Sequence, residues 1–393
     1  WLVGEIAVIG LPRSARSVAT LLARSGNAVY ASDADRSPEH EATGAVLEGE
    51  GVAVDVVTHN LDRIGRASLI VISPGVPPDV PAVRLAQERG TQVVSEVEIA
   101  LRFLPNASYL AITGTNGKTT TTAMADHLLR SLGLRAVAAG NIGTPLSEIA
   151  LQPVPPPWIA LEVSSYQLHF TPIIQPAVGV LTNLSPNHLD RYASVDEYYA
   201  DKKLLLRNAS PASMWVSNAD DPDAQRLVAG AAGIHGRFSI TRHADAYFDR
   251  DSESLVVLGE ELLSRHEFPL VGDHNVANAL AATLAVMLAH PDHRGPDALQ
   301  RLAHGLRGFR SLEHRIEAVS EVGGVLWIND SKSTNVASTL VALRGMSQPT
   351  ILLLGGKHKG EPYGALAPEL KRVVKRVIAY GQAAPEITRD LAG

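Results

Sequence analysis

The residues best suited to chemistry stand in a short run, GTNGKTT, that begins at Gly114. Gly114 and Gly117 allow the main chain to turn its N–H groups inward, toward an anion. Lys118 can reach the β- and γ-phosphates of a nucleotide, and the hydroxyl of Thr119 can bind Mg²⁺. The strict eight-residue P-loop pattern would require Gly where Ile112 stands, so only its short core is present. The alternative is a Gly/Asn turn that caps an ordinary helix, but the Lys-Thr pair favours phosphate binding.

Glu162 lies inside an apolar run, IALEVSS, that is predicted to be a strand over 159–165. A buried carboxylate needs a partner, and Mg²⁺ beside a triphosphate would supply one. The alternative is a strand-end Glu that reaches water. Ser164 could position a substrate or could cap the next helix. The sequence favours the metal interpretation for Glu162.

Two further candidates follow the next predicted strand. His188 lies in the polar run TNLSPNHLDRY, and it could bind a metal or a substrate or be structural. Lys202 belongs to a helical segment in which a lysine is, by default, on the surface. Composition alone gives no reason to single it out.

Two lysine-containing loops near the end of the chain also follow predicted strands. NDSKSTN, at 329–335, and GGKHKG, at 355–360, would form an anion- and nucleotide-binding face if both came from one sheet. The alternative is two solvated turns. Arg315, just past the second domain boundary, could close on phosphate oxygens.

The elements that must position these residues alternate between strand and helix. In the first hundred residues, Val/Ile-rich runs and a helical segment predict βαβ units and a parallel sheet. After Gly10 the Rossmann pattern GxGxxG is only partly met, with Pro12 and Ala15 in the other glycine positions. Asp33 ends the second strand, where an acidic side chain often meets a nucleotide's hydroxyl groups; the alternative is a solvated turn residue.

Three consecutive α/β domains are predicted, over 1–104, 105–310 and 311–393. Leu104-Pro105-Asn106 is the first linker, because Pro disfavours helix before it and a strand follows. In the middle domain we expect a long helix at about 195–209 and an apolar helix at 274–288. In the third domain we expect strands at 325–330, 350–356 and 376–381 in one further sheet.

Composition excludes several classes of protein. A net charge of −6 gives no general attraction to nucleic acid or to an anionic membrane, so an anionic substrate must be met locally. The chain has no cysteine, which excludes a disulfide framework and a thiolate nucleophile and fits the cytoplasm. No apolar run approaches the ~20 residues of a membrane span, and no signal sequence is visible.

Taken together, GTNGKTT, LEVSSYQL, TNLSPNHLDRY, the segment from Tyr198 to Lys202, GDHNVANALAA, EHRIE, NDSKSTN and LLLGGKHKG resemble the Mur ligase family in kind and order. The resemblance covers nearly the whole chain. It implies a Rossmann-like UDP-binding domain, a central P-loop ATPase domain and a Rossmann-like C-terminal domain.

Within the family, the first loop and the NHLDRY and NDSKSTN motifs resemble the branch that adds D-glutamate to UDP-N-acetylmuramoyl-L-alanine (UDP-MurNAc-L-Ala). The resemblance implies an ATP-dependent ligase that forms an amide through an acyl phosphate, in bacterial cytoplasmic peptidoglycan precursor synthesis, and a monomer. The alternatives are a sister ligase that adds another amino acid and a nucleotide-sugar binding protein without turnover. Folylpolyglutamate synthetase is disfavoured because it has no such first domain.

The resemblance also implies roles for individual residues. ATP would be bound by Gly114, Thr115, Asn116, Gly117, Lys118, Thr119, Thr120, Asn275, Arg315 and Asp330. Two Mg²⁺ ions would be held by Thr119, Glu162, His188 and Lys202, the last as a carbamate formed with CO₂, and Lys118, His188 and Lys202 would be catalytic. The UDP-sugar would contact Asp33, Arg36, Ser73, Asn141 and Ser164, and D-glutamate would contact Thr334 and Lys359.

Two features depart from the family pattern. Pro12 and Arg13 replace the small and hydroxyl residues common in the first loop, which puts UDP-phosphate contacts there in doubt. The family normally continues beyond Gly393 through a SPAxAS-type segment that completes D-glutamate binding. We therefore expect the third domain to be incomplete.

Overall fold

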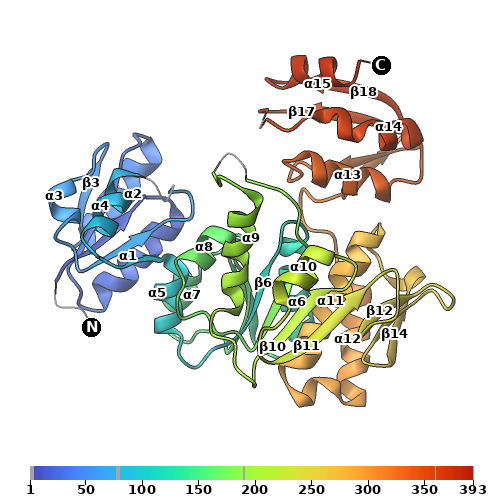
Figure 1. Ribbon diagram of the computed structural model, residues 1–393, viewed down its shortest axis with the longest axis horizontal. Coiled ribbons are helices and arrows are strands. Elements are labelled where there is room, and N and C mark those ends of the chain that lie inside the picture. Colours follow the sequence, from blue (N-terminus) through green and yellow to red (C-terminus); the bar gives the residue numbers. More distant parts are fainter. Residues whose placement is uncertain (1–3, 77–79, 189–190, 359, 393) are drawn as a thin grey trace.

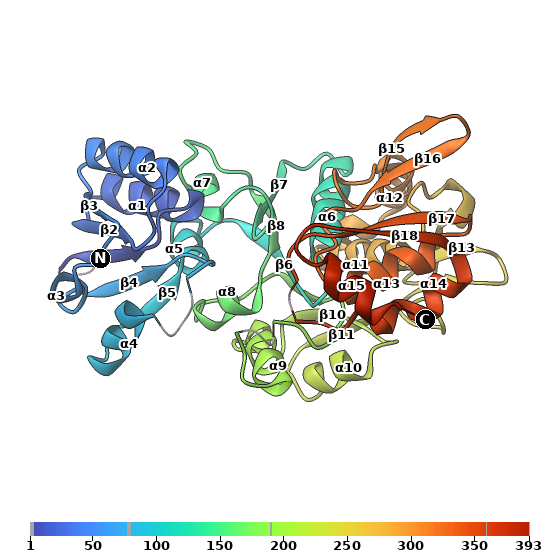
Figure 2. The same ribbon diagram turned by 90° about the horizontal axis from the view of Figure 1, so that it is seen from above.

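The computed structural model describes residues 4–76, 80–188, 191–358 and 360–392. Figure 1 shows three α/β units in succession, which confirms the predicted fold class. The third unit lies over the half of the middle unit that carries α11 (Asp273–Ala289), as the view from above in Figure 2 also shows. The boundaries at 104 and 310 stay a prediction. None of the described helices has the length and apolar character needed to cross a membrane.

The first unit is a five-stranded parallel sheet in the order β3-β2-β1-β4-β5. Its central strands are apolar and buried along their whole length, as expected for a parallel sheet that helices cover on both faces. The strands are β1 (Ile6–Ile9), β2 (Val29–Asp33), β3 (Ala53–Val56), β4 (Leu69–Ile72) and β5 (Val93–Ser95). The helices are α1 (Arg13–Arg24), α2 (Pro38–Gly49), α3 (Leu61–Ile64), α4 (Pro81–Glu88) and α5 (Glu96–Phe103).

The middle unit contains a nine-stranded sheet in the order β14-β13-β12-β11-β10-β9-β6-β8-β7. The strands from β6 to β12 run parallel, and β13 and β14 add an antiparallel edge. The strands are β6 (Ser108–Thr113), β7 (Ala136–Gly140), β8 (Trp158–Glu162), β9 (Val178–Leu181), β10 (Met214–Asn218), β11 (Ile234–Ser239), β12 (Ala246–Asp249), β13 (Ser254–Val257) and β14 (Glu260–Ser264). The helices besides α11 are α6 (Lys118–Ser131), α7 (Leu146–Ala150), α8 (Ser165–His169), α9 (Val195–Lys203), α10 (Pro222–Val228) and α12 (Pro296–Gly308).

Helix α11 forms the centre of the middle unit's core. It is apolar nearly all round, as a fully buried helix must be, and it packs against α6 and the strands β9 to β13. Because α6 begins directly after the GTNGKTT turn, this packing anchors the phosphate loop to the largest hydrophobic cluster of the protein.

The predicted helix at 195–209 is shorter than expected. Helix α9 ends at Lys203, and a single 3₁₀ turn over Leu204–Leu206 follows it. Leu205 and Leu206 are buried against the middle unit's second hydrophobic cluster, so tertiary packing replaces the continued helix.

The third unit does not form the single sheet that we predicted. An antiparallel hairpin of β15 (Glu317–Val322) and β16 (Val325–Asn329) is separate from the parallel pair β17 (Thr350–Gly355) and β18 (Val374–Tyr380). The helices are α13 (Val336–Gly345), α14 (Ala367–Val373) and α15 (Ala384–Asp390). The loops after β16 and β17 therefore come from different sheets, and the prediction that one sheet presents both was wrong.

Polar contacts join the first unit to the middle unit. The guanidinium of Arg13 pairs with both carboxylate oxygens of Glu148 at 2.6 Å and donates to the carbonyl oxygen of Gly143 at 3.0 Å. The buried Glu96 accepts a 2.5 Å hydrogen bond from the main-chain N–H of Ser147 in the first turn of α7. Burial raises the pKa of Glu96 to about 7, and the nearby carboxylate of Glu148 adds to the rise.

Replacing Glu96 by Gln should weaken the pH dependence of stability. In the folded protein Glu96 keeps its proton up to about pH 7, whereas in the unfolded chain it ionises near its usual value of 4.5. The folded state therefore binds the extra proton between these values, and the wild type should lose stability as pH rises through them, by ~1.4 kcal/mol per pKa unit. Thermal melting from pH 4.5 to 8 should show the melting temperature of Glu96→Gln rising relative to that of the wild type as pH increases. A constant difference between Glu96→Gln and the wild type across this pH range would contradict the assignment.

Candidate functional site

The phosphate loop connects β6 to α6 and depends on two glycines. Gly117, the residue before α6, has a φ of 81° and Gly114 a φ of 146°. A Cβ atom on Gly114 would lie 2.0 Å from Oγ1 of Thr182, and one on Gly117 would lie 2.4 Å from Oδ1 of Asn278. Both positions therefore require glycine for conformation and for space. The turn exposes the N–H groups of the first turn of α6, which have no partner within the helix.

Lys118 folds back over the loop. Its Nζ donates to the carbonyl oxygens of Gly114 at 3.1 Å and Thr115 at 2.9 Å. Burial lowers the pKa of Lys118; Glu162 opposes this effect and the positive charge of Arg315 adds to it. The lysine is thus held at the loop, where its charge can act on a bound phosphate.

Glu162 lies one strand away from the loop, as predicted. Strand β8 pairs with β6 in a register that places Glu162 opposite Ile112. Its Oε1 accepts from Nδ2 of Asn141 at 2.9 Å, and its buried Oε2 has no hydrogen-bond partner among the described residues. An unsatisfied buried carboxylate oxygen is costly, and a divalent cation that prefers oxygen ligands would satisfy it.

Lys202 is buried, with 1% of its surface exposed, so the default interpretation of a surface lysine was wrong. Its Nζ lies 3.4 Å from Oγ1 of Thr113 and 4.8 Å from the ring centroid of Tyr198. Burial lowers the pKa of Lys202 well below its usual value, and the charge of Lys118 lowers it further. A lowered pKa favours the unprotonated amine, which is the nucleophilic form of lysine.

His188 lies beside the same cluster. Its ring is 5.7 Å from that of Tyr166 and 5.9 Å from that of Tyr198, and its φ is 56°. Within the described part of the chain, no three His, Asp or Glu side chains are grouped so as to hold a metal ion.

Arg315 comes from the start of the third unit and reaches the phosphate loop. Its Nη2 donates to Oγ1 of Thr119 at 2.9 Å. The main-chain N–H of the next residue, Ile316, donates to Oδ1 of Asp330 at 3.1 Å, so Asp330 lies close to the Arg315 segment. Asn275, in α11, is buried and donates to the carbonyl oxygen of Val271. Lys118 and Arg315 place positive charge at this edge of a chain of net negative charge.

The predicted UDP-sugar residues fall in two places. Asp33 and Ser73 lie at the carboxyl edge of the first sheet: Asp33 accepts from the N–H of Leu11 at 2.7 Å, and the buried Ser73 lies beside Gly10. Arg36 is exposed on the same side and pairs with Glu41. Asp33 is thus tied to the first loop and is not a free turn residue.

The other two members of that set are in the middle unit. Asn141 donates two hydrogen bonds to Glu162, one from its side chain to the carboxylate and one from its main-chain N–H to the carbonyl oxygen. Ser164 caps α8 and forms a capping box with Gln167, which was the structural alternative for this residue. Thr334 is exposed in the loop after β16, and Lys359 lies outside the described residues.

The structure also brings in residues that our sequence analysis did not single out. Tyr198 donates to or accepts from Oγ1 of Thr115 at 3.2 Å, and Thr182 and Asn183 contact Asn116. Their position in the sequence could have indicated this role for Thr182 and Asn183, because they are the first polar residues after the apolar strand β9.

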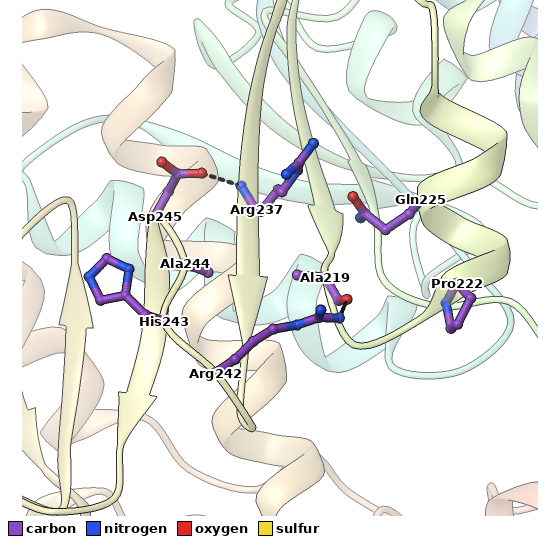
Figure 3. A pocket seen from close by; sticks show the side chains of 8 residues that line it. All are labelled: Ala219, Pro222, Gln225, Arg237, Arg242, His243, Ala244 and Asp245. Carbon is purple, nitrogen blue, oxygen red and sulfur yellow. Dashed lines mark hydrogen bonds between the residues drawn. The ribbon is translucent and has the colours of Figure 1, made fainter.

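A separate hollow of about 680 Å³ lies beside the ends of β10 and β11 (Figure 3). It is lined by Ala219, Pro222, Gln225, Arg237, Arg242, His243, Ala244 and Asp245. The guanidinium of Arg242 is engaged by the carbonyl oxygen of Ala219 and by Asp220, and Asp245 accepts from the N–H of Arg237. These contacts serve the local turn, and the hollow is not part of the phosphate site.

Fold and site together define a nucleotide-binding α/β protein with a phosphate loop at the carboxyl edge of its second sheet. Two protein-family models match this chain. The model described as "Mur ligase MurD-like, N-terminal domain" matches residues 4–95, and the model described as "Mur ligase middle domain" matches residues 112–286. The chain belongs to the Mur ligase family.

Curated relatives extend the match over nearly the whole chain. The UDP-N-acetylmuramoylalanine–D-glutamate ligase of Salinibacter ruber is 37% identical over 401 positions, covering 98% of this chain and 85% of that protein. The enzyme of the same name from Acidobacterium capsulatum is 36% identical and covers 99% and 84%.

Solved structures share the fold. MurF from Acinetobacter baumannii has a TM-score of 0.65 at 19% identity, covering 98% of this chain and 83% of that chain. UDP-N-acetylmuramate-alanine ligase MurC from Thermotoga maritima has a TM-score of 0.61 at 20% identity, covering 99% and 88%.

Gly114→Ala should disable the loop. The new Cβ would collide with Thr182, and the positive φ adds ~1–2 kcal/mol of strain for an L-residue. We expect nucleotide affinity to fall by about tenfold or more, measured as the Kd of ADP with Mg²⁺ by calorimetry. Gly230→Ala is the matched control, since Gly230 has a φ of 77° but no atom within 4 Å of the added Cβ. Equal, small effects of both variants on the Kd would refute the steric argument.

Proposed function

We propose that this protein is an ATP-dependent ligase that joins D-glutamate to UDP-N-acetylmuramoyl-L-alanine, in peptidoglycan precursor synthesis in the bacterial cytoplasm. The observation that carries the proposal is the phosphate loop with Lys118 and Arg315 on it and Glu162 one strand away. The curated relatives of this name, at 36–37% identity over nearly the whole chain, support the choice of substrates. We further propose that the protein acts as a monomer.

The proposed sites follow the three units. Residues 114–120 would bind the ATP phosphates, with Arg315 closing on them and Asn275 and Asp330 toward the nucleoside. Asp33, Arg36 and Ser73 would hold the uridine end of the sugar nucleotide, with Asn141 and Ser164 nearer the muramoyl end. Thr334 and Lys359 would bind a carboxylate of D-glutamate.

Mg²⁺ fits the residues present, because Glu162 has a buried oxygen without a hydrogen-bond partner among the described residues. Thr119 and Glu162 would hold one ion, and His188 and Lys202 a second. Bound there, Mg²⁺ would neutralise charge on the transferring phosphoryl group.

The reaction has two steps that this chain's residues would serve. A carboxylate oxygen of the alanyl group attacks the γ-phosphorus of ATP, the bond to the β–γ bridging oxygen breaks, and ADP leaves. The amine of D-glutamate then attacks the acyl carbon, loses a proton and displaces inorganic phosphate. Lys118 and Arg315 would stabilise the charge on the phosphoryl group, and the sheet edge would hold both reactants in line.

ADP release tests this function directly. We expect release only when ATP, the UDP-sugar and D-glutamate are all present, and much less when L-Ala, L-Lys or diaminopimelate replaces D-glutamate. ADP release that does not change when the UDP-sugar or the amino acid is omitted would rule the proposal out.

We also propose that Lys202 acts as a carbamate, formed when its unprotonated Nζ attacks CO₂ and loses a proton. Such a modification replaces a cation with an anion that can bind Mg²⁺. Lys202→Ala should reduce the ligase rate by about a hundredfold or more, since general loss of a charge-stabilising group has effects of that order. Added formate or acetate should restore part of the rate. The exposed neighbour Lys203, replaced by Ala, is the control; no rescue, or an equal loss in the control, would contradict the role.

A further inference from the structure

The main-chain N–H and C=O groups of Asn116, in the middle of the phosphate loop, are both held by the residues that follow β9. The side chain of Asn183 accepts from the N–H of Asn116 through Oδ1 at 2.9 Å and donates to its carbonyl oxygen through Nδ2 at 2.9 Å. Oγ1 of Thr182 donates to the same carbonyl oxygen at 2.7 Å. The main-chain oxygen of Asn183 also accepts from the N–H of Thr115 at 2.8 Å.

These contacts decide which way the loop's polar groups face. A loop that binds phosphate through N–H groups must keep its carbonyl oxygens away from the anion, because two electronegative oxygens repel. Lys118 engages the carbonyl oxygens of Gly114 and Thr115, and the Thr182–Asn183 pair engages that of Asn116. All three carbonyl groups that precede Gly117 thus have a donor.

We propose that Asn183 is a positioning residue of the nucleotide site, which orients the main chain at Asn116 so that the N–H groups at the start of α6 face the phosphates. The proposal rests on the proposed use of ATP. A carboxamide suits this role because it donates and accepts at once, which matches the main-chain N–H and C=O groups of one residue. An aspartate would place an acceptor against the carbonyl oxygen of Asn116, and an alanine would provide neither contact.

The test measures the Kd of ADP with excess Mg²⁺ by calorimetry, together with the melting temperature of each variant. Asn183→Ala should weaken ADP binding by about tenfold or more, since it removes two hydrogen bonds to the main chain of Asn116. Asn183→Asp should weaken it further. Thr182→Val should have a smaller effect because Nδ2 of Asn183 still engages the carbonyl oxygen, and Thr182→Ser, which keeps the hydroxyl, should bind like the wild type.

Asn208→Ala is the matched control. The Nδ2 of Asn208 also donates to two main-chain oxygens, those of Pro172 and Ile174, but outside the phosphate loop. This variant should lower the melting temperature and leave the Kd of ADP unchanged.

A lowered melting temperature for Asn183→Ala with a Kd within about twofold of the wild type would overturn the proposal, as would wild-type binding by Asn183→Asp. If Asn183→Ala does not fold, Asn183→Asp decides, and a Kd of ADP within about twofold of the wild type for that variant would overturn the proposal. Because ADP binding needs neither the UDP-sugar nor D-glutamate, these outcomes are independent of the ADP-release assay that tests the ligase function.

Discussion

The burial of charged groups at the carboxyl edge of the nine-stranded sheet is the constraint on which the rest of the site depends. Lys202 and Glu162 are almost inaccessible, and Lys118 and Arg315 contact the phosphate loop between them. Isolated buried charges are costly, and here Lys118 lies close enough to both Glu162 and Arg315 for their charges to shift its pKa. An arrangement of this kind is stabilised when an anion and a divalent cation bind together, which is what a nucleotide triphosphate with Mg²⁺ provides.

The sheet order explains why these groups meet. Strand β6 lies between β8, which ends at Glu162, and β9, which leads into Thr182 and Asn183. Parallel strands present their carboxyl ends at one edge, so Glu162, Thr182 and Asn183 converge on the loop after β6. Lys202, in α9, reaches Thr113 at the end of β6 from 89 positions away. Helix α11 contacts the first turn of α6, directly after the loop, through Asn278, whose Oδ1 accepts a hydrogen bond from Oγ1 of Thr121 at 3.2 Å.

The other two units meet the middle unit in different ways. The first unit is joined to it by the buried contact of Glu96 with Ser147 and by the pairing of Arg13 with Glu148. The contact of Glu148 also explains the unusual Arg13 in the first loop: its guanidinium serves the interface between units. The third unit reaches the phosphate loop through Arg315, between His314 and Ile316, which both have positive φ. Such backbone strain is typical of functional segments.

Local sequence determined the phosphate loop, the alternation of strands and helices, and the presence of three α/β units, because glycine spacing and apolar periodicity act over a few residues. Motif order identified the family and pointed to Lys202, whose own helical segment looked like surface. Only the tertiary structure decided that Lys202 is buried, that Glu162 has an unsatisfied oxygen, that Asn183 holds the loop, and that β16 and β17 belong to separate sheets. The physical reason is that burial and strand pairing depend on contacts between distant segments, which no local pattern contains.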